Sequence, residues 1–186
     1  LQTLRTFGQH GNGVVRPSLS DADMAARRWL AERMESAGLL THIDGVANVF
    51  GRSPASGKAL LIGSHSDTQP TGGWLDGALG VVYGLEIARA RREDPATREL
   101  PVDVVSWVDE EGTFLGCLGS RAYCGLLSET DPSDVRSAAG ESLQDAFRRN
   151  GLGGITDATR FEPGRHAGYF EAHIEQGPFL EEGGLA

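Results

Sequence analysis

The sequence predicts an α/β fold, a three-layer α/β/α sandwich around a mixed, mostly parallel sheet. Short apolar runs that suit buried strands alternate along the chain with segments of helical periodicity, and this alternation is typical of such sandwiches. Two of the apolar runs end directly in imidazole or carboxylate side chains, as strands of open α/β sheets do where they carry functional groups. The length of 186 residues, with 39% hydrophobic and 23% charged residues, suffices for one domain with a core.

Helical segments are expected at 21–37, 78–92, 121–127 and 142–149. Ser20 is a suitable N-cap for the first of them and Gly38 a suitable stop. The apolar positions of this helix repeat every four residues, at Ala22, Ala26, Leu30 and Met34. Residues 1–19 have no clear periodicity, and we expect turns there, with a loop at 10–13.

Strands are expected at 41–44, 47–51, 58–63, 102–108 and 169–174. The third of them leads into His65 and Asp67, and the fourth leads into an acidic run at 109–111. The last strand is expected to carry His173 itself. These strands would deliver their polar side chains to one crevice at the edge of the sheet.

The charge and cysteine content limits the classes of partner. A formal net charge of -9 disfavours nucleic acid and anionic membrane surfaces, which require clustered Lys and Arg. No apolar stretch reaches the roughly 18 to 20 residues that span a bilayer, and no signal-peptide pattern is visible. Cys117 and Cys124 are expected to be free thiols. We therefore expect a cytoplasmic protein with no membrane partner.

The polar residues at the strand ends suggest a metal site. They are His65, Asp67, Asp76, Glu110, Glu111 and His173. Imidazole and carboxylate ligands together suit Zn²⁺, with Mn²⁺, Co²⁺ or Ni²⁺ as substitutes. Four carboxylates in one apolar-walled crevice would repel one another unless cations compensated their charge, which favours two metal ions.

Each of these features also has a simpler interpretation. His65-Ser66-Asp67 alone is typical of a hydrogen-bonded turn, and Glu110-Glu111 alone is typical of a solvated loop. His173 alone fits a strand histidine with satisfied hydrogen bonds. The joint occurrence of all three after apolar strands favours the metal site.

Four blocks closely resemble the hydantoinase/carbamoylase family. They are Gly-Ser-His-Ser-Asp-Thr at 63–68, Gly-Gly-Trp-Leu-Asp-Gly-Ala-Leu-Gly-Val at 72–81, Asp-Glu-Glu-Gly at 109–112 with Gly-Ser-Arg at 119–121, and His-Ile-Glu-Gln-Gly-Pro at 173–178. That family contains N-carbamoyl-L-amino-acid hydrolases, β-ureidopropionases and allantoate amidohydrolases, within the di-zinc aminoacylase and carboxypeptidase superfamily. The last block discriminates most, because the exopeptidase and deacylase branches typically carry a carboxylate at the position of His173.

The resemblance implies a role for each polar residue. One metal ion would be bound by His65, Asp76 and His173, and Asp76 would bridge to a second ion that is also held by Glu111. Glu110 would be the general base. The remaining two roles are the orientation of His65 by Asp67 and a substrate contact by Gln176.

The reaction implied is hydrolysis of the ureido or carbamoyl C–N bond of N-carbamoyl-L-amino acids or allantoate by a metal-activated water, with Glu110 as base. Two alternatives remain open. One is a metal-binding or structural remnant without catalysis, and the other is a dipeptidase or deacylase of the same superfamily.

The resemblance also implies that residues 1–186 are the N-terminal portion of a catalytic domain. The lid and dimerisation domain, and a C-terminal segment that completes both the sheet and the second metal site, would lie outside this chain. We therefore expect an incomplete second site, little or no activity from this chain alone, and a homodimer for the full-length protein.

Overall fold

The computed structural model describes residues 1–128 and 134–185. The helices are α1 (Gln2–Thr6), α2 (Asp21–Ser36), α3 (Ala78–Glu93), α4 (Leu118–Tyr123), α5 (Leu143–Arg149), the 3-10 turn η1 (Gly154–Asp157) and α6 (Phe179–Glu182). The strands are β1 (Gln9–His10), β2 (Gly13–Val14), β3 (Leu40–Ile43), β4 (Val49–Arg52), β5 (Ala59–His65), β6 (Val102–Trp107) and β7 (His166–Phe170). The predicted helices and strands therefore form, with boundaries shifted by a few residues.

The main sheet has the strand order β3-β4-β6-β5-β7. The pairs β3–β4 and β4–β6 are antiparallel, whereas β6–β5 and β5–β7 are parallel. The sheet is mixed, as predicted, but parallel and antiparallel pairs are equal in number. The β3–β4 pair is a hairpin, because a short connection can join antiparallel strands only.

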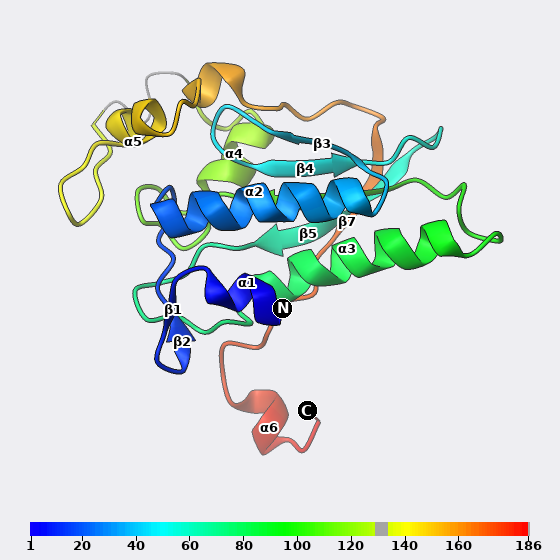
Figure 1. Cartoon of the computed structure of the whole chain (residues 1–186), viewed down its shortest axis with the longest axis horizontal. Coiled ribbons are helices and arrows are strands. Elements are labelled where there is room, and N and C mark those ends of the chain that lie inside the picture. Colours follow the sequence, from blue (N-terminus) through cyan, green and yellow to red (C-terminus); the bar gives the residue numbers. More distant parts are fainter. Residues whose placement is uncertain (129–133, 186) are drawn as a thin grey trace.

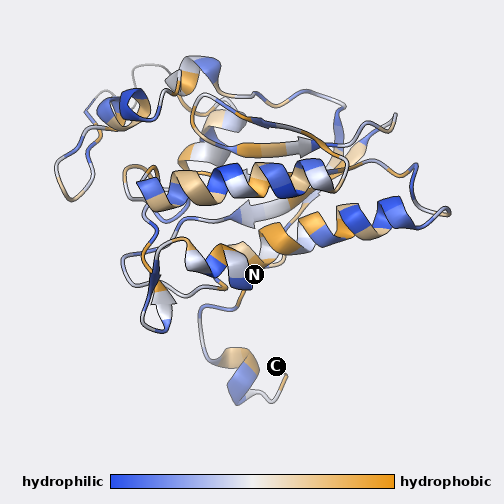
Figure 2. Ribbon diagram, viewed as in Figure 1, coloured by the Kyte–Doolittle hydropathy of each residue, from blue (hydrophilic) through white to orange (hydrophobic). Residues whose placement is uncertain are grey.

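Helices α2 and α3 cover one face of this sheet (Figure 1). Ser20 caps α2 by accepting a hydrogen bond from the backbone N–H of Asp23. The residues buried between the helices and the strands include Ala26, Leu30, Met34, Val49, Ile62, Val81, Leu85 and Val104. Figure 2 shows α3 apolar near its N-terminal end and polar toward its C-terminal end. The end of α3 nearest the site is thus the end held most firmly by apolar packing.

The opposite face of the sheet is covered by a smaller layer. Tyr123 of α4 packs there in a cluster with Phe50, Leu61, Val105 and Trp107. A further apolar core, which includes Val108, Leu118, Leu143 and Phe147, joins α4 and α5 to the end of β6. Helical segments therefore lie on both faces, which confirms the predicted α/β sandwich.

Two segments differ from the sequence prediction. Residues 1–19, expected to be turns, contain α1 and the β1–β2 hairpin. The last strand begins at His166 and ends at Phe170, so His173 lies beyond the strand rather than on it. The strand starts early because Arg165 and His166 both contact the buried carboxylate of Asp103 on β6. The sequence did not predict this start, because Ala167 and Gly168 have low β-propensity.

In the described part of the chain, no helix combines the length and apolar character needed to cross a membrane. Cys117 and Cys124 are free and exposed, as expected, and they flank α4 at its two ends.

Candidate metal centre

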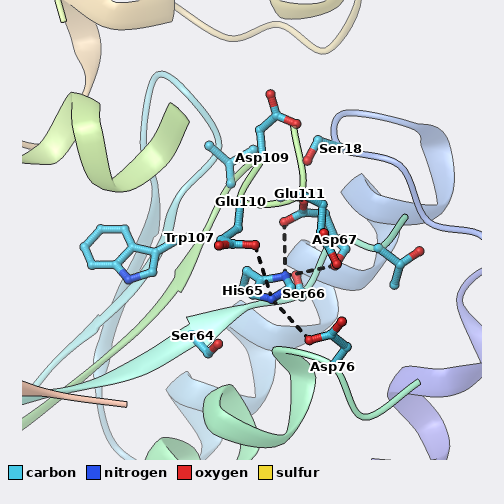
Figure 3. Close-up of polar contacts among 12 residues, drawn as sticks. Ser18, Ser64, His65, Ser66, Asp67, Asp76, Trp107, Asp109, Glu110 and Glu111 are labelled. Atoms are coloured by element: carbon cyan, nitrogen blue, oxygen red, sulfur yellow. Dashed lines mark hydrogen bonds and ion pairs between the residues drawn. The ribbon is translucent and has the colours of Figure 1, made fainter. Parts of the chain in front are cut away.

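Two parallel strands bring the site residues to one edge of the sheet. His65 is the last residue of β5 and is paired with Trp107, the last residue of β6. The chain after Trp107 then leads within a few residues to Glu110 and Glu111. Figure 3 shows the carboxylates of Glu110 and Asp76 near the imidazole of His65. The predicted convergence of the two strand ends is therefore present.

His65, Asp76 and His173 form one group of three ligand atoms, all within 4.8 Å of one another. The two histidine Nε2 atoms are 3.4 Å apart. Oδ1 of Asp76 lies 3.2 Å from Nε2 of His173 and 3.8 Å from Nε2 of His65. His65 is almost fully buried, whereas His173 and Asp76 are partly exposed. These are the three residues predicted for the first metal ion.

The hydrogen bonds of both imidazoles suit a cation between them. Nδ1 of His65 lies 3.0 Å from the backbone oxygen of Asp67, and Nδ1 of His173 lies 2.9 Å from that of Ile174. A carbonyl oxygen only accepts, so each Nδ1 is the donor of its hydrogen bond, and each ring turns its Nε2 toward the centre of the group. The two Nε2 atoms and the carboxylate of Asp76 therefore face one another. A divalent cation is the group that this donor set fits.

A second group of three joins His65 to Glu110 and Glu111. Oε2 of Glu110 is 3.7 Å from Nε2 of His65. The carboxylate of Glu111 accepts a hydrogen bond of 2.9 Å from the side chain of Gln69. Burial raises the pKa of Glu111 despite this bond, because the carboxylate is partly removed from water.

The predicted pairing of Asp76 with Glu111 around a second ion differs from this grouping. Among the described residues, Glu111 groups with Glu110 and His65, whereas Asp76 groups with His65 and His173. Both oxygens of Asp76 accept hydrogen bonds from the amide of Gln176, at 3.1 and 3.0 Å. The bridging role of Asp76 and the substrate contact of Gln176 both stay predictions.

Asp67 is fully buried and connects the two groups. Its backbone oxygen bonds Nδ1 of His65, while its carboxylate oxygen Oδ1 lies 3.7 Å from the same nitrogen. The other oxygen, Oδ2, accepts a hydrogen bond of 3.1 Å from the backbone N–H of Glu111. Asp67 therefore contacts His65 mainly through its backbone and Glu111 through its side chain.

Sequence reasoning missed several supporting residues. Asp109 is fully buried at a positive φ of 54° and accepts hydrogen bonds from the backbone of Phe114 and Leu115, which closes the loop after β6. Burial raises the pKa of Asp109 to about 6. No sequence signal marks Gln69. A cavity of about 430 Å³ adjoins Gln69 and Glu111 and has Phe114 in its wall.

Comparison with known proteins identifies the family of the chain. Residues 46–160, more than half of the chain, match the profile of Peptidase family M28. The chain is 37% identical to an N-carbamoyl-L-amino acid amidohydrolase of Geobacillus stearothermophilus, over 99% of this chain and 47% of that protein. It is 39% identical to an allantoate deiminase of Arabidopsis thaliana, over 96% of this chain and 36% of that protein.

Among solved structures, the chain is similar to a hydantoinase/carbamoylase family amidase from Burkholderia phymatum. The TM-score is 0.94 at 57% sequence identity, over 98% of this chain and 45% of that one. The chain thus spans about half the length, or less, of the relatives it matches. The profile match shows that this chain belongs to Peptidase family M28, and the chain is also similar to amidases of the hydantoinase/carbamoylase family.

Proposed function

We propose that this chain is the N-terminal part of the catalytic domain of a metal-dependent amidohydrolase. Its substrates would be N-carbamoyl-L-amino acids or ureido compounds of the allantoate type, and the bond cleaved would be the carbamoyl C–N bond. The observation that carries the proposal is the convergence of His65, Asp76 and His173, with both histidine Nε2 atoms turned toward Asp76 and both Nδ1 atoms bonded to backbone oxygens. The names of the relatives support the substrate class.

The proposed reaction gives separate roles to the bound metal ions and to Glu110. Bound divalent cations would polarise the ureido oxygen and make water a stronger acid. The proposed base is Glu110, whose side chain is 42% exposed and lies 3.7 Å from Nε2 of His65, and it accepts a proton from the attacking water. Glu110 then returns this proton to the departing amine nitrogen, which leaves as the free amino group. The carbamic acid that is also formed decomposes to ammonia and CO₂.

Two divalent ions, Zn²⁺ by preference, are proposed as cofactors. His65, Asp76 and His173 are the ligands proposed for the first ion. Glu111 and Asp76 are the ligands proposed for the second ion, and we expect this second set of ligands to be incomplete in this chain. For the full-length protein we propose a cytoplasmic homodimer, with a lid and dimerisation domain outside residues 1–186.

Metal binding tests the site directly. The apo chain would be titrated with Zn²⁺ by calorimetry, and its metal content measured after dialysis. We expect one tight equivalent and a second weak one. His173→Ala should abolish the tight equivalent, whereas His10→Ala, which removes an exposed histidine of β1, should retain it. A wild-type chain that binds no metal would refute the site and favour a non-catalytic remnant.

Hydrolysis is best tested in a chimera. This chain would replace the matching part of the Burkholderia phymatum amidase, to which it is 57% identical. Ammonia release would be assayed with N-carbamoyl-L-amino acids, N-carbamoyl-β-alanine and allantoate, and amine release with dipeptides and N-acyl amino acids. We expect the carbamoyl and ureido compounds to be cleaved. Cleavage of dipeptides alone would instead favour a peptidase, and the unfused chain should release little or no ammonia.

A further inference from the structure

Arg27 lies behind the metal centre, fully buried on α2. Its NH1 donates hydrogen bonds to the backbone oxygens of Ala47 and Trp107, at 3.1 and 3.2 Å. Its NH2 donates to the same oxygen of Trp107 at 3.3 Å and lies 3.7 Å from Oδ1 of Asp67. One guanidinium therefore contacts the end of β6 and the carboxylate that follows β5.

These two contacts lead to different site residues. Trp107 is the last residue of β6, after which the chain carries Glu110 and Glu111. Asp67 bonds Nδ1 of His65 through its backbone and the N–H of Glu111 through its carboxylate. Within the described part of the chain, Oδ1 of Asp67 accepts no hydrogen bond, so its nearby partners are the charge of Arg27 and the ring of His65.

Stability alone gives a poor account of this arrangement. Arg16, Asp23, Arg27 and Asp67 are all fully buried, and replacing buried ion pairs with apolar residues is often neutral or stabilising. Asp23 fixes Arg27 through a bond of 2.8 Å one helical turn away. Asp23 and the backbone oxygen of Trp107 fix the Arg27 guanidinium, which holds its positive charge 3.7 Å from Oδ1 of Asp67.

We infer that Arg27 is a positioning residue for the metal centre, which it orders by holding Asp67 and the end of β6. This inference rests on the proposed metal-dependent function. Partners that orient metal ligands from behind typically change metal affinity 10- to 100-fold when they are removed. Arg27→Lys keeps the charge but cannot reach both Trp107 and Asp67, so it should weaken Zn²⁺ binding by about 10- to 100-fold.

The test is a double-mutant cycle on this chain, with Arg27→Lys, Asp67→Asn and the double variant. Zn²⁺ affinity is measured by calorimetry, and the visible absorption of bound Co²⁺ reports ligand geometry. Measurements are made under solution conditions in which circular dichroism shows that each variant is folded. Met34→Ala, which removes buried apolar contacts two turns along the same helix, serves as a control that lowers stability without touching the site.

If Arg27 acts through Asp67, the double variant binds Zn²⁺ no more weakly than the weaker single variant, and the Co²⁺ spectrum changes in both single variants but not in Met34→Ala. Affinities of Arg27→Lys within twofold of wild type, or losses that multiply in the double variant, would overturn the inference. Should Arg27→Lys fail to fold, Asp67→Asn tests the same link, and a wild-type affinity and Co²⁺ spectrum in that variant would overturn it. A wild-type chain without metal affinity would instead refute the proposed metal site itself.

Discussion

Substitution of Gly77 tests whether the position of the His65 imidazole depends on close packing against the backbone before α3. It lies between Asp76 and the start of α3, with φ 61° and ψ −46°. A Cβ atom added there would stand 2.3 Å from Cδ2 and 2.4 Å from Nε2 of His65. Carbon atoms in contact normally lie about 3.5 to 4.0 Å apart. Alanine at this position must therefore displace the imidazole or shift the Asp76 backbone.

The expected loss has two parts. The backbone conformation costs about 1–3 kcal/mol for a residue with a Cβ, and overpacking adds about 1–3 kcal/mol. Gly11→Ala is the matched control, because Gly11 also has a positive φ, 55°, but no atom lies within 4 Å of the added Cβ. The difference in unfolding free energy between the two variants isolates the contact with His65.

Urea unfolding and Zn²⁺ calorimetry measure the two consequences. We expect Gly77→Ala to lose about 2–6 kcal/mol of unfolding free energy, the sum of these ranges, and Gly11→Ala to lose the backbone part alone. Zn²⁺ affinity should fall by about 10-fold or more in Gly77→Ala, since metal sites tolerate shifts of only about 0.5 Å, and should be unchanged in Gly11→Ala. Equal stabilities and wild-type Zn²⁺ affinity in both variants would refute the reasoning.

Three further predictions concern other residues. Asn48 accepts a hydrogen bond from Val108 and donates to Asp44 and Gly119, so Asn48→Ala should cost about 3 kcal/mol in urea unfolding, at roughly 1 kcal/mol per bond; a loss below about 0.5 kcal/mol would contradict this network. Ser20→Ala removes the cap of α2 and should cost about 1 kcal/mol in the same assay, whereas Ser20→Asp, which keeps an acceptor, should cost less. Glu110→Gln should keep the rise in melting temperature on adding Zn²⁺, which EDTA reverses, but abolish ammonia release in the chimera; full turnover there would exclude Glu110 as the base.

Much of the fold follows from local pattern. The α2 helix begins at Asp21 because Ser20 caps it, and its buried residues Ala26, Leu30 and Met34 match the predicted stripe. The apolar pattern did not predict that Asp23 and Arg27 are buried. They lie on the same face of α2 as Leu30 and Met34 and are buried with them. An opposite-charge pair at this spacing is usually a solvated surface pair. Only the packing of α2 against the sheet shows that this pair is buried.

The last strand shows where local pattern fails. Its start at His166 depends on Asp103, more than 60 residues earlier in the chain. Such a contact leaves no trace in the periodicity of residues 166–170. For the same reason, the position of His173 beyond the strand was not predictable from the apolar run alone.

The sequence by itself determined the residue types of the site and their order along the chain, because strand ends and glycine turns are set by local propensity and spacing. The tertiary structure decided which of them meet. It brings Nε2 of His173 to 3.4 Å from that of His65, 108 residues away, and it places Glu111 with Glu110 rather than with Asp76. The first of these distances depends on the tertiary packing of segments remote in sequence, and the approach of Glu110 to His65 depends on the parallel register of β5 and β6.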